Sequence, residues 1–204
     1  MVGTHVPLNE SGLHPLCNSG RRSPCCCTRR GSRDFAQVVL HHREALADEF
    51  EFFDACREGD AEAVKMFVDA QSMDLNYADE DGHTPLVLAV NQGHVDVVEV
   101  LVDGGADIEL ASDYPADVDC PLSAAASHGH LDLVKLLLEK GASIEGRGKD
   151  GRTALMTAAA KGRLGAVVLL LDKGANVDAG KIDGTTPLFW ASHGGHADVV
   201  SADT

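Results

Sequence analysis

Apolar residues in the larger, C-terminal part of the chain recur in short runs that are separated by glycine. Aligned on one glycine per run, the chain reads ACREGDAEAVKMFV at Gly59, AVNQGHVDVVEVLV at Gly93, AASHGHLDLVKLLL at Gly129, AAAKGRLGAVVLLL at Gly162 and ASHGGHADVV at Gly195. These glycines recur every 33 to 36 residues. A period of this length indicates an array of repeated structural units.

The residues within one unit predict two short helices. Thr84 can cap the first helix with its hydroxyl, and Pro85 fits the first helical position, where a missing N–H is tolerated. Gly93 can take the left-handed backbone conformation that ends this helix. The second helix then has an apolar stripe, which consists of Val95, Val98, Leu101 and Val102.

Turns frame this helix pair. Gly104 and Gly105 end the second helix, and Asp81 with Gly82 suits a hairpin-like bend before the first. Each helix has roughly 8–9 residues, which is fewer than the ~12–15 that an isolated helix needs for marginal stability. Contacts with neighbouring units must supply the rest, so the pattern predicts a stack that grows in one dimension.

Further motifs recur at fixed places in these units. The segments HTPLVLA, DCPLSAA, RTALMTA and TTPLFWA lie upstream of four of the glycines, and DGGADIE, EKGASIE and DKGANVD follow the complete units. Together with the recurring G-H and V-V-x-L-L-L patterns, these residues resemble the ankyrin repeat family over about residues 48–200. The resemblance implies an all-α fold, a solenoid of stacked helix-turn-helix units with projecting hairpin-like loops.

The chain departs from the family pattern at one recurring position. The family usually has His after T-P-L, where this chain has Val87, Ser123, Met156 and Phe189. We therefore expect apolar packing to replace the polar link between repeats that is associated with that histidine. One unit also has Cys120 in place of Thr and Val118 in place of Gly, and extra residues in ASDYPADVDC predict a differently shaped loop.

These patterns divide the chain into an N-terminal segment and an array. We expect a disordered basic leader over residues 1–33, and over 34–47 a helix that either shields the first unit or is loosely attached. The array over 48–200 is then expected to comprise a cap over 48–78, repeats over about 79–112, 113–148 and 149–180, and a partial repeat over 181–200, with a tail over 201–204.

The last unit breaks off within its second helix, after GHADVV, where a complete unit continues with a run such as LLLDKGA. We interpret the chain as a fragment of a longer array; an end that another molecule covers is the alternative. In both cases we expect the last apolar residues to be partly uncovered, namely Phe189, Trp190, Val199 and Val200.

Charge differs between the two parts of the chain. There are 17 Lys and Arg against 32 Asp and Glu, a formal net charge of −15, yet the N-terminal 40 residues hold five Arg and only two acidic residues. An acidic array disfavours nucleic acid as a partner and favours basic proteins. No apolar run reaches the ~20 residues of a membrane span, and no secretory signal is evident. We expect a cytoplasmic protein; the nucleus and organelle import are alternatives.

Most cysteines lie in the leader. Cys25, Cys26 and Cys27 are flanked by arginines, and they allow three interpretations: a leader without function, which we favour, acylated cysteines that anchor the chain to lipid, or a zinc site. Cys56 and Cys120 lie within helical patterns and are expected to be small core residues in a reducing compartment. No metal and no cofactor is expected.

The histidines and the missing motifs argue against catalysis. The resemblance assigns a structural role to the histidines that follow the helix-ending glycines, which are His94, His130 and His196. His41 and His42 lie beside Glu44, but adjacent residues of a helix point in different directions and do not form a metal site. The sequence has no phosphate-binding glycine loop followed by Lys, no Gly-x-Ser-x-Gly and no His-Glu-x-x-His. We expect no enzymatic activity.

Positions that vary between the units are candidates for contacts with a partner, because in the family they line the concave binding surface. They are His83, Asp119 and Arg152 before the helix cap, Asn91, Gln92, Ser127, His128, Lys161 and His193 at the ends of first helices, and Tyr77, Asp79, Asp113, Tyr114, Arg147, Lys149 and Lys181 at loop tips. The loop tips change from acidic to basic along the chain, so a partner of opposite polarity would dock in one orientation. Ordinary surface variation is the alternative for any single residue.

The sequence thus predicts a non-catalytic scaffold or adaptor that binds a protein partner through its concave face and loop tips. One alternative is the targeting part of a longer ankyrin-containing enzyme or channel whose active domain is missing here. A lipid-anchored adaptor is another. Neither the partner's identity nor the oligomeric state follows from the sequence.

Overall fold

The fold was obtained as a computed structural model, which describes residues 49–79, 81–111, 120–181 and 183–202. All of these residues belong to one compact unit, Arg43–Thr204. The predicted leader, the predicted helix over 34–47 and most of the loop before the second full repeat lie outside the described residues.

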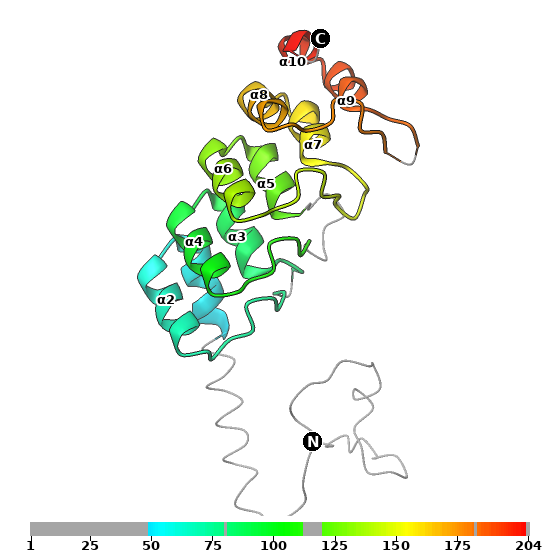
Figure 1. Ribbon diagram of the computed structural model, residues 1–204. Coiled ribbons are helices and arrows are strands. Elements are labelled where there is room, and N and C mark those ends of the chain that lie inside the picture. Colours follow the sequence, from blue (N-terminus) through cyan, green and yellow to red (C-terminus); the bar gives the residue numbers. More distant parts are fainter. Residues whose placement is uncertain (1–48, 80, 112–119, 182, 203–204) are drawn as a thin grey trace, which may run out of the picture. The chain divides into compact units, whose positions relative to one another are not determined.

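The described residues form pairs of short helices, as predicted (Figure 1). Residues 49–58 are helical, and Phe52 of this segment contacts Phe67 of the next helix at a ring-centroid distance of 5.5 Å. The helices that follow are α2 (Ala61–Asp69), α3 (Pro85–Gln92), α4 (Val95–Asp103), α5 (Pro121–His128), α6 (Leu131–Glu139), α7 (Ala154–Ala160), α8 (Leu164–Asp172), α9 (Pro187–Gly194) and α10 (Ala197–Ala202).

The pairs stack in two rows. First helices pack on first helices, α3 on α5, α5 on α7 and α7 on α9. Second helices pack in the same way from α2 to α10, and each first helix also contacts its own second helix. Figure 1 shows the connecting loops extending beyond the row of first helices. The predicted all-α solenoid with projecting loops is confirmed.

The first helices begin and end at the predicted residues. Thr84, Thr153 and Thr186 accept a hydrogen bond from the backbone N–H three residues later, which satisfies one of the free donors at the helix start. Cys120 occupies the same position before α5, and its side chain makes no capping hydrogen bond. Gly93 has a φ of 85° after α3, the left-handed conformation that the sequence predicted.

The core lies between neighbouring units. Leu86, Leu122 and Leu155 occupy equivalent places in their first helices and are at most 2% exposed. Leu188 occupies the same place in α9, after which no further first helix is described, and it is 41% exposed. Of the apolar residues expected to be uncovered near the end, Phe189 is exposed, but Val199 is fully buried because α10 packs on α8 and α9. For Val199 the expectation was wrong.

Side chains at the start of the second helices link neighbouring units. Each lies close to a backbone carbonyl of the preceding unit: His94 Nε2 is 3.0 Å from Arg57 O, His130 Nε2 3.5 Å from Asn91 O, His196 Nε2 3.2 Å from Ala160 O, and Arg163 Nε donates to Ser127 O at 2.9 Å. These contacts confirm the structural role predicted for the three histidines. They also supply a polar link between units. At the positions where the family usually has His, Val87 and Met156 are fully buried and apolar as expected, whereas Ser123 is buried but polar and Phe189 is 50% exposed.

The loops form hairpin-like bends that acidic side chains hold closed. In the last described loop, Lys181 N donates to Thr185 O at 2.9 Å, and Gly184 has a φ of 80°. The hydroxyl and the backbone N–H of Thr185 both donate to Asp183 Oδ1, and these hydrogen bonds lower the pKa of the Asp183 carboxyl. Adjacent loops are joined as well, since Glu109 Oε1 accepts a hydrogen bond from Ser143 N at 2.7 Å.

None of the helices in the described part of the chain combines the length and the apolar composition that crossing a membrane requires.

Candidate protein interface

The residues predicted to contact a partner differ in their solvent exposure. Three of them, Asp113, Tyr114 and Asp119, lie outside the described residues. The exposed candidates are Tyr77, Gln92, His128, Arg147, Lys149, Lys161 and His193. The half-buried candidates are Asp79, His83, Asn91, Ser127, Arg152 and Lys181.

Asp79 holds its own loop closed. Its Oδ1 accepts hydrogen bonds from the backbone N–H of Asp81 at 3.0 Å and of His83 at 2.8 Å. Asp79 N in turn donates to His83 O at 2.9 Å, and only 14% of the Asp79 side chain is exposed. The sequence placed Asp79 among the partner contacts, and the structure adds this internal role in shaping the loop.

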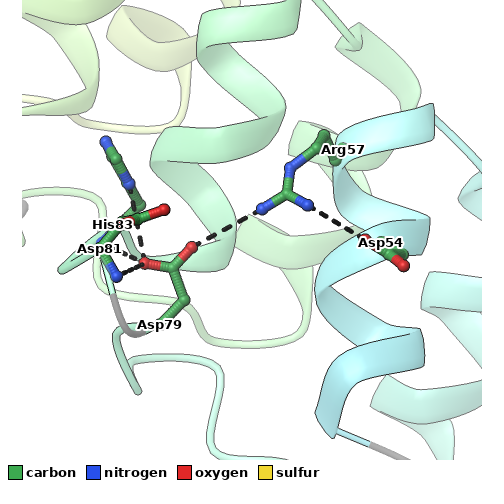
Figure 2. A network of polar contacts seen from close by, with 5 residues as sticks. All are labelled: Asp54, Arg57, Asp79, Asp81 and His83. Atoms are coloured by element: carbon green, nitrogen blue, oxygen red, sulfur yellow. Dashed lines mark hydrogen bonds and ion pairs between the residues drawn. The ribbon is translucent and has the colours of Figure 1, made fainter.

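Arg57 joins this loop to the first helical segment (Figure 2). Its Nη1 donates to Asp54 Oδ1 at 3.0 Å, and its Nη2 lies 3.8 Å from Asp79 Oδ2. Asp54 and Arg57 are three residues apart on one helical face, whereas Asp79 contacts Arg57 from the loop that follows α2. The network therefore fixes the loop against the helix that starts the array.

A hollow with a volume of ≈ 370 Å³ lies beside this network. Two large side chains at its wall are open to solvent, Phe50 at 68% and Tyr77 at 55% exposure. Its lining consists of Glu49, Phe50, Phe53, Asp54, Arg57, Tyr77, Asp79 and Asp81. We call this site the N-terminal hollow.

Of this lining, the sequence predicts only Tyr77 and Asp79 as partner contacts, and Asp81 as part of a hairpin-like bend. Phe50, Asp54 and Arg57 are not among the predicted contacts, because residues 48–78 are expected to form a cap. The signal was present in DEFEFFDACRE, where positions four and three residues apart carry an aromatic, an acidic and a basic side chain on one helical face.

The last described units carry a second cluster, built on aromatic rings. The guanidinium carbon of Arg152 lies 3.9 Å from the centroid of the Trp190 ring, a cation–π geometry. Arg152 Nε also lies 2.8 Å from Asp150 Oδ2, an ion pair whose geometry is not that of a hydrogen bond. The ring of His193 stacks on Phe189 at a centroid distance of 6.0 Å. Arg152 and His193 are thus engaged within the array as well as lying at its surface.

Exposed basic side chains accompany this second cluster. Arg147 Nη1 donates to Gly151 O at 2.9 Å, which orients the guanidinium across its own loop. Lys149, in the same loop, and Lys161, just after α7, are exposed. Of the loop-tip charges that the sequence orders from acidic to basic, Asp79 and Lys181 are half-buried and Arg147 and Lys149 are exposed, whereas Glu80 and Asp113 lie outside the described residues.

One group of potential metal ligands occurs in the described part of the chain. Ligand atoms of Asp79, Asp81 and His83 lie within 4.8 Å of one another. Asp79 Oδ1 already accepts two backbone hydrogen bonds and lies 3.6 Å from His83 Nδ1. The loop conformation accounts for this cluster without an ion.

Comparisons with known proteins place these features in a family. The model of ankyrin repeats (three copies) matches residues 25–112 and 122–202. Scaffold protein ILK of Homo sapiens is 42% identical over 60 residues, which are 29% of this chain and 13% of that protein. Acyl-CoA-binding domain-containing protein 6 of Bos taurus is 36% identical over 64 residues (31% and 23%), and BTB/POZ domain-containing protein 3 of Schizosaccharomyces pombe is 43% identical over 56 residues (28% and 11%).

The matched regions cover less than a quarter of each of these relatives. The likeness therefore concerns the repeats and not the whole proteins. Over most of its length, however, this chain matches the family model, and its helix pairs, capping threonines and histidine contacts with the preceding unit have the arrangement that the repeats predict. The chain belongs to the ankyrin repeat family.

Proposed function

We propose that this chain is a non-catalytic module that binds a segment of another protein across its loops and the ends of its first helices. Ankyrin repeats are protein interaction modules, and one matched relative is named a scaffold protein. The observation that carries the proposal is the ordered change of charge, from Asp79 and Asp81 to Arg147, Lys149 and Lys161. A partner segment with basic residues at one end and acidic residues at the other would bind in one direction.

Affinity capture with the full chain as bait tests this proposal. The variant Arg147→Ala/Lys149→Ala/Lys161→Ala should lose specific partners, because it removes exposed charges that a partner would contact. The matched control, Lys65→Ala/Lys135→Ala/Lys173→Ala, removes equal charge from exposed positions on or just after the second helices. Mass spectrometry of the captured proteins should show partners that the control retains and the first variant loses. Equal capture by the two variants would contradict the proposed face.

A second proposal is that the array is the targeting part of a longer protein. The observation in its favour is that the matched relatives extend far beyond their repeats. Mapping the full transcript tests it, since a stop codon directly after Thr204 would exclude a downstream domain. For either proposal we place the protein in the cytoplasm, because Cys56 and Cys120 are buried thiols, as expected for a reducing compartment.

A further inference from the structure

We infer that the N-terminal hollow binds the arginine or lysine side chain of a basic segment in the partner protein. The inference rests on the proposed interaction function and specifies the chemistry of one contact. It concerns the hollow between residues 49–57 and the loop after α2, which is lined by four acidic residues, Arg57 and three aromatic rings.

The aromatic rings supply the first argument. Phe50 and Tyr77 come from different elements, the first helical segment and the loop, and both are more than half exposed at the wall of the hollow. Phe53, by contrast, is buried within the core. A cation over the face of an aromatic ring is attracted by the ring quadrupole. Two exposed rings beside one hollow therefore favour a cationic guest with an apolar stem, which is the shape of an arginine or lysine side chain.

Charge supplies the second argument. The lining carries four carboxylates, on Glu49, Asp54, Asp79 and Asp81, against the single guanidinium of Arg57. Arg57 contacts Asp54 and Asp79 (Figure 2), so its charge is directed at those two carboxylates. In the described part of the chain, no basic group lies within 4.0 Å of the carboxylates of Glu49 or Asp81. The hollow therefore presents excess negative charge beside its two exposed rings, and a cation is the complementary guest.

Size and hydrogen bonding narrow the guest further. A volume of ≈ 370 Å³ is at the lower end of ligand pockets, which suits one side chain more than a larger ligand. A metal ion at Asp79, Asp81 and His83 would compete with the backbone hydrogen bonds that Asp79 Oδ1 accepts. A guanidinium or ammonium group can reach Glu49 and Asp81 without disturbing those bonds.

Fluorescence anisotropy with the full chain tests this inference. The probe is a fluorescein-labelled glycine–serine peptide with two arginines, and the reference is the same peptide with citrulline, an uncharged isostere, at both positions. We expect the arginine peptide to bind at least about tenfold more tightly, a difference of about 1.4 kcal/mol. The double variant Phe50→Ala/Tyr77→Ala should remove most of this preference without changing the net charge of the protein.

A charge-matched pair of variants separates the hollow from the general acidity of the chain. Glu49→Gln/Asp81→Asn should reduce the preference for arginine several-fold. Glu62→Gln/Glu139→Gln removes the same charge from exposed positions on α2 and α6 and should leave the preference unchanged. Circular dichroism at 222 nm should show equal helicity for all variants, because none of these side chains belongs to the core.

Three results would overturn the inference: equal affinity for the two peptides, an unchanged preference in Phe50→Ala/Tyr77→Ala, or equal effects of the two charge variants. None of these results touches the proposed function, which fails only if the variant at Arg147, Lys149 and Lys161 captures the same proteins as its control.

Discussion

At the scale of single residues, burial determines the chemistry of Cys56. Its side chain is fully buried in the first helical segment, and burial raises the pKa of the thiol from 9.0 to about 12. The thiolate is the reactive form, so Cys56 in the folded chain should resist iodoacetamide at pH 8. Peptide mapping by mass spectrometry should find Cys56 alkylated in urea but not in buffer. Rapid alkylation of the folded protein would contradict its burial.

The raised pKa of Cys56 also predicts how the stability of the fold depends on pH. The unfolded chain releases the Cys56 proton near pH 9.0, whereas the folded chain keeps it up to a pH of about 12. The contribution of this group to stability is therefore complete below pH 9 and declines as the pH rises between these two values. Urea unfolding at pH 8 and pH 10 should show a lower midpoint at pH 10, and Cys56→Ser should reduce the difference between the two.

Tyr77, Asp79 and Arg57 of the N-terminal hollow show which properties of a residue can be predicted from a sequence. Tyr77 lies at a loop tip, and its exposure could be predicted because loop tips face solvent. The role of Asp79 could not, because its hydrogen bonds to Asp81 and His83 exist only once the loop has closed. The contact of Arg57 with Asp79 could not be predicted either, because it joins a residue of the first helical segment to a residue of the loop after α2.

At the scale of elements, the helix α5 lacks a cap that its counterparts have. Thr84 and Thr153 cap α3 and α7 from buried positions, whereas the thiol of Cys120 makes no such hydrogen bond. Cys120→Thr should therefore supply the cap and raise the free energy of unfolding by about 1 kcal/mol. Thr153→Ala should lower it by a similar amount. Urea unfolding followed by circular dichroism measures both, and a destabilised Cys120→Thr variant would show that the site cannot accept a hydroxyl.

The starts and ends of the helices were the features that the sequence predicted best. Capping threonines, Pro85 and the glycines after first helices act within a few residues of chain, so their effect can be anticipated locally. The N-terminal hollow could not be predicted in this way, because it forms only where the first helical segment meets the loop after α2, which lies more than 20 residues further along the chain. The covering of Val199 was missed for a related reason: it depends on how α10 packs on α8 and α9.

At the scale of the whole molecule, the array is held together by contacts between adjacent units, because each helix is too short to be stable alone. The polar links from His94, His130, Arg163 and His196 repeat along the same stack as the buried leucines. A repeat with neighbours on both sides therefore gains from two interfaces. The last described repeat is stabilised by only one such interface. This difference in stabilisation should be measurable by substituting equivalent residues in the two kinds of repeat.

Leu155 and Leu188 provide this measurement, because they occupy the same place in α7 and α9. Leu155 is 1% exposed between its neighbours, whereas Leu188 is 41% exposed. Leu155→Ala removes buried methyl groups and leaves a cavity, so it should cost about 2–5 kcal/mol of unfolding free energy. Leu188→Ala removes a side chain that water already reaches and should cost less than about 1.5 kcal/mol. Equal losses in urea unfolding would mean that the end of the array is covered in solution, by a second copy of the chain or by another molecule, and sedimentation of the two variants would then identify self-association.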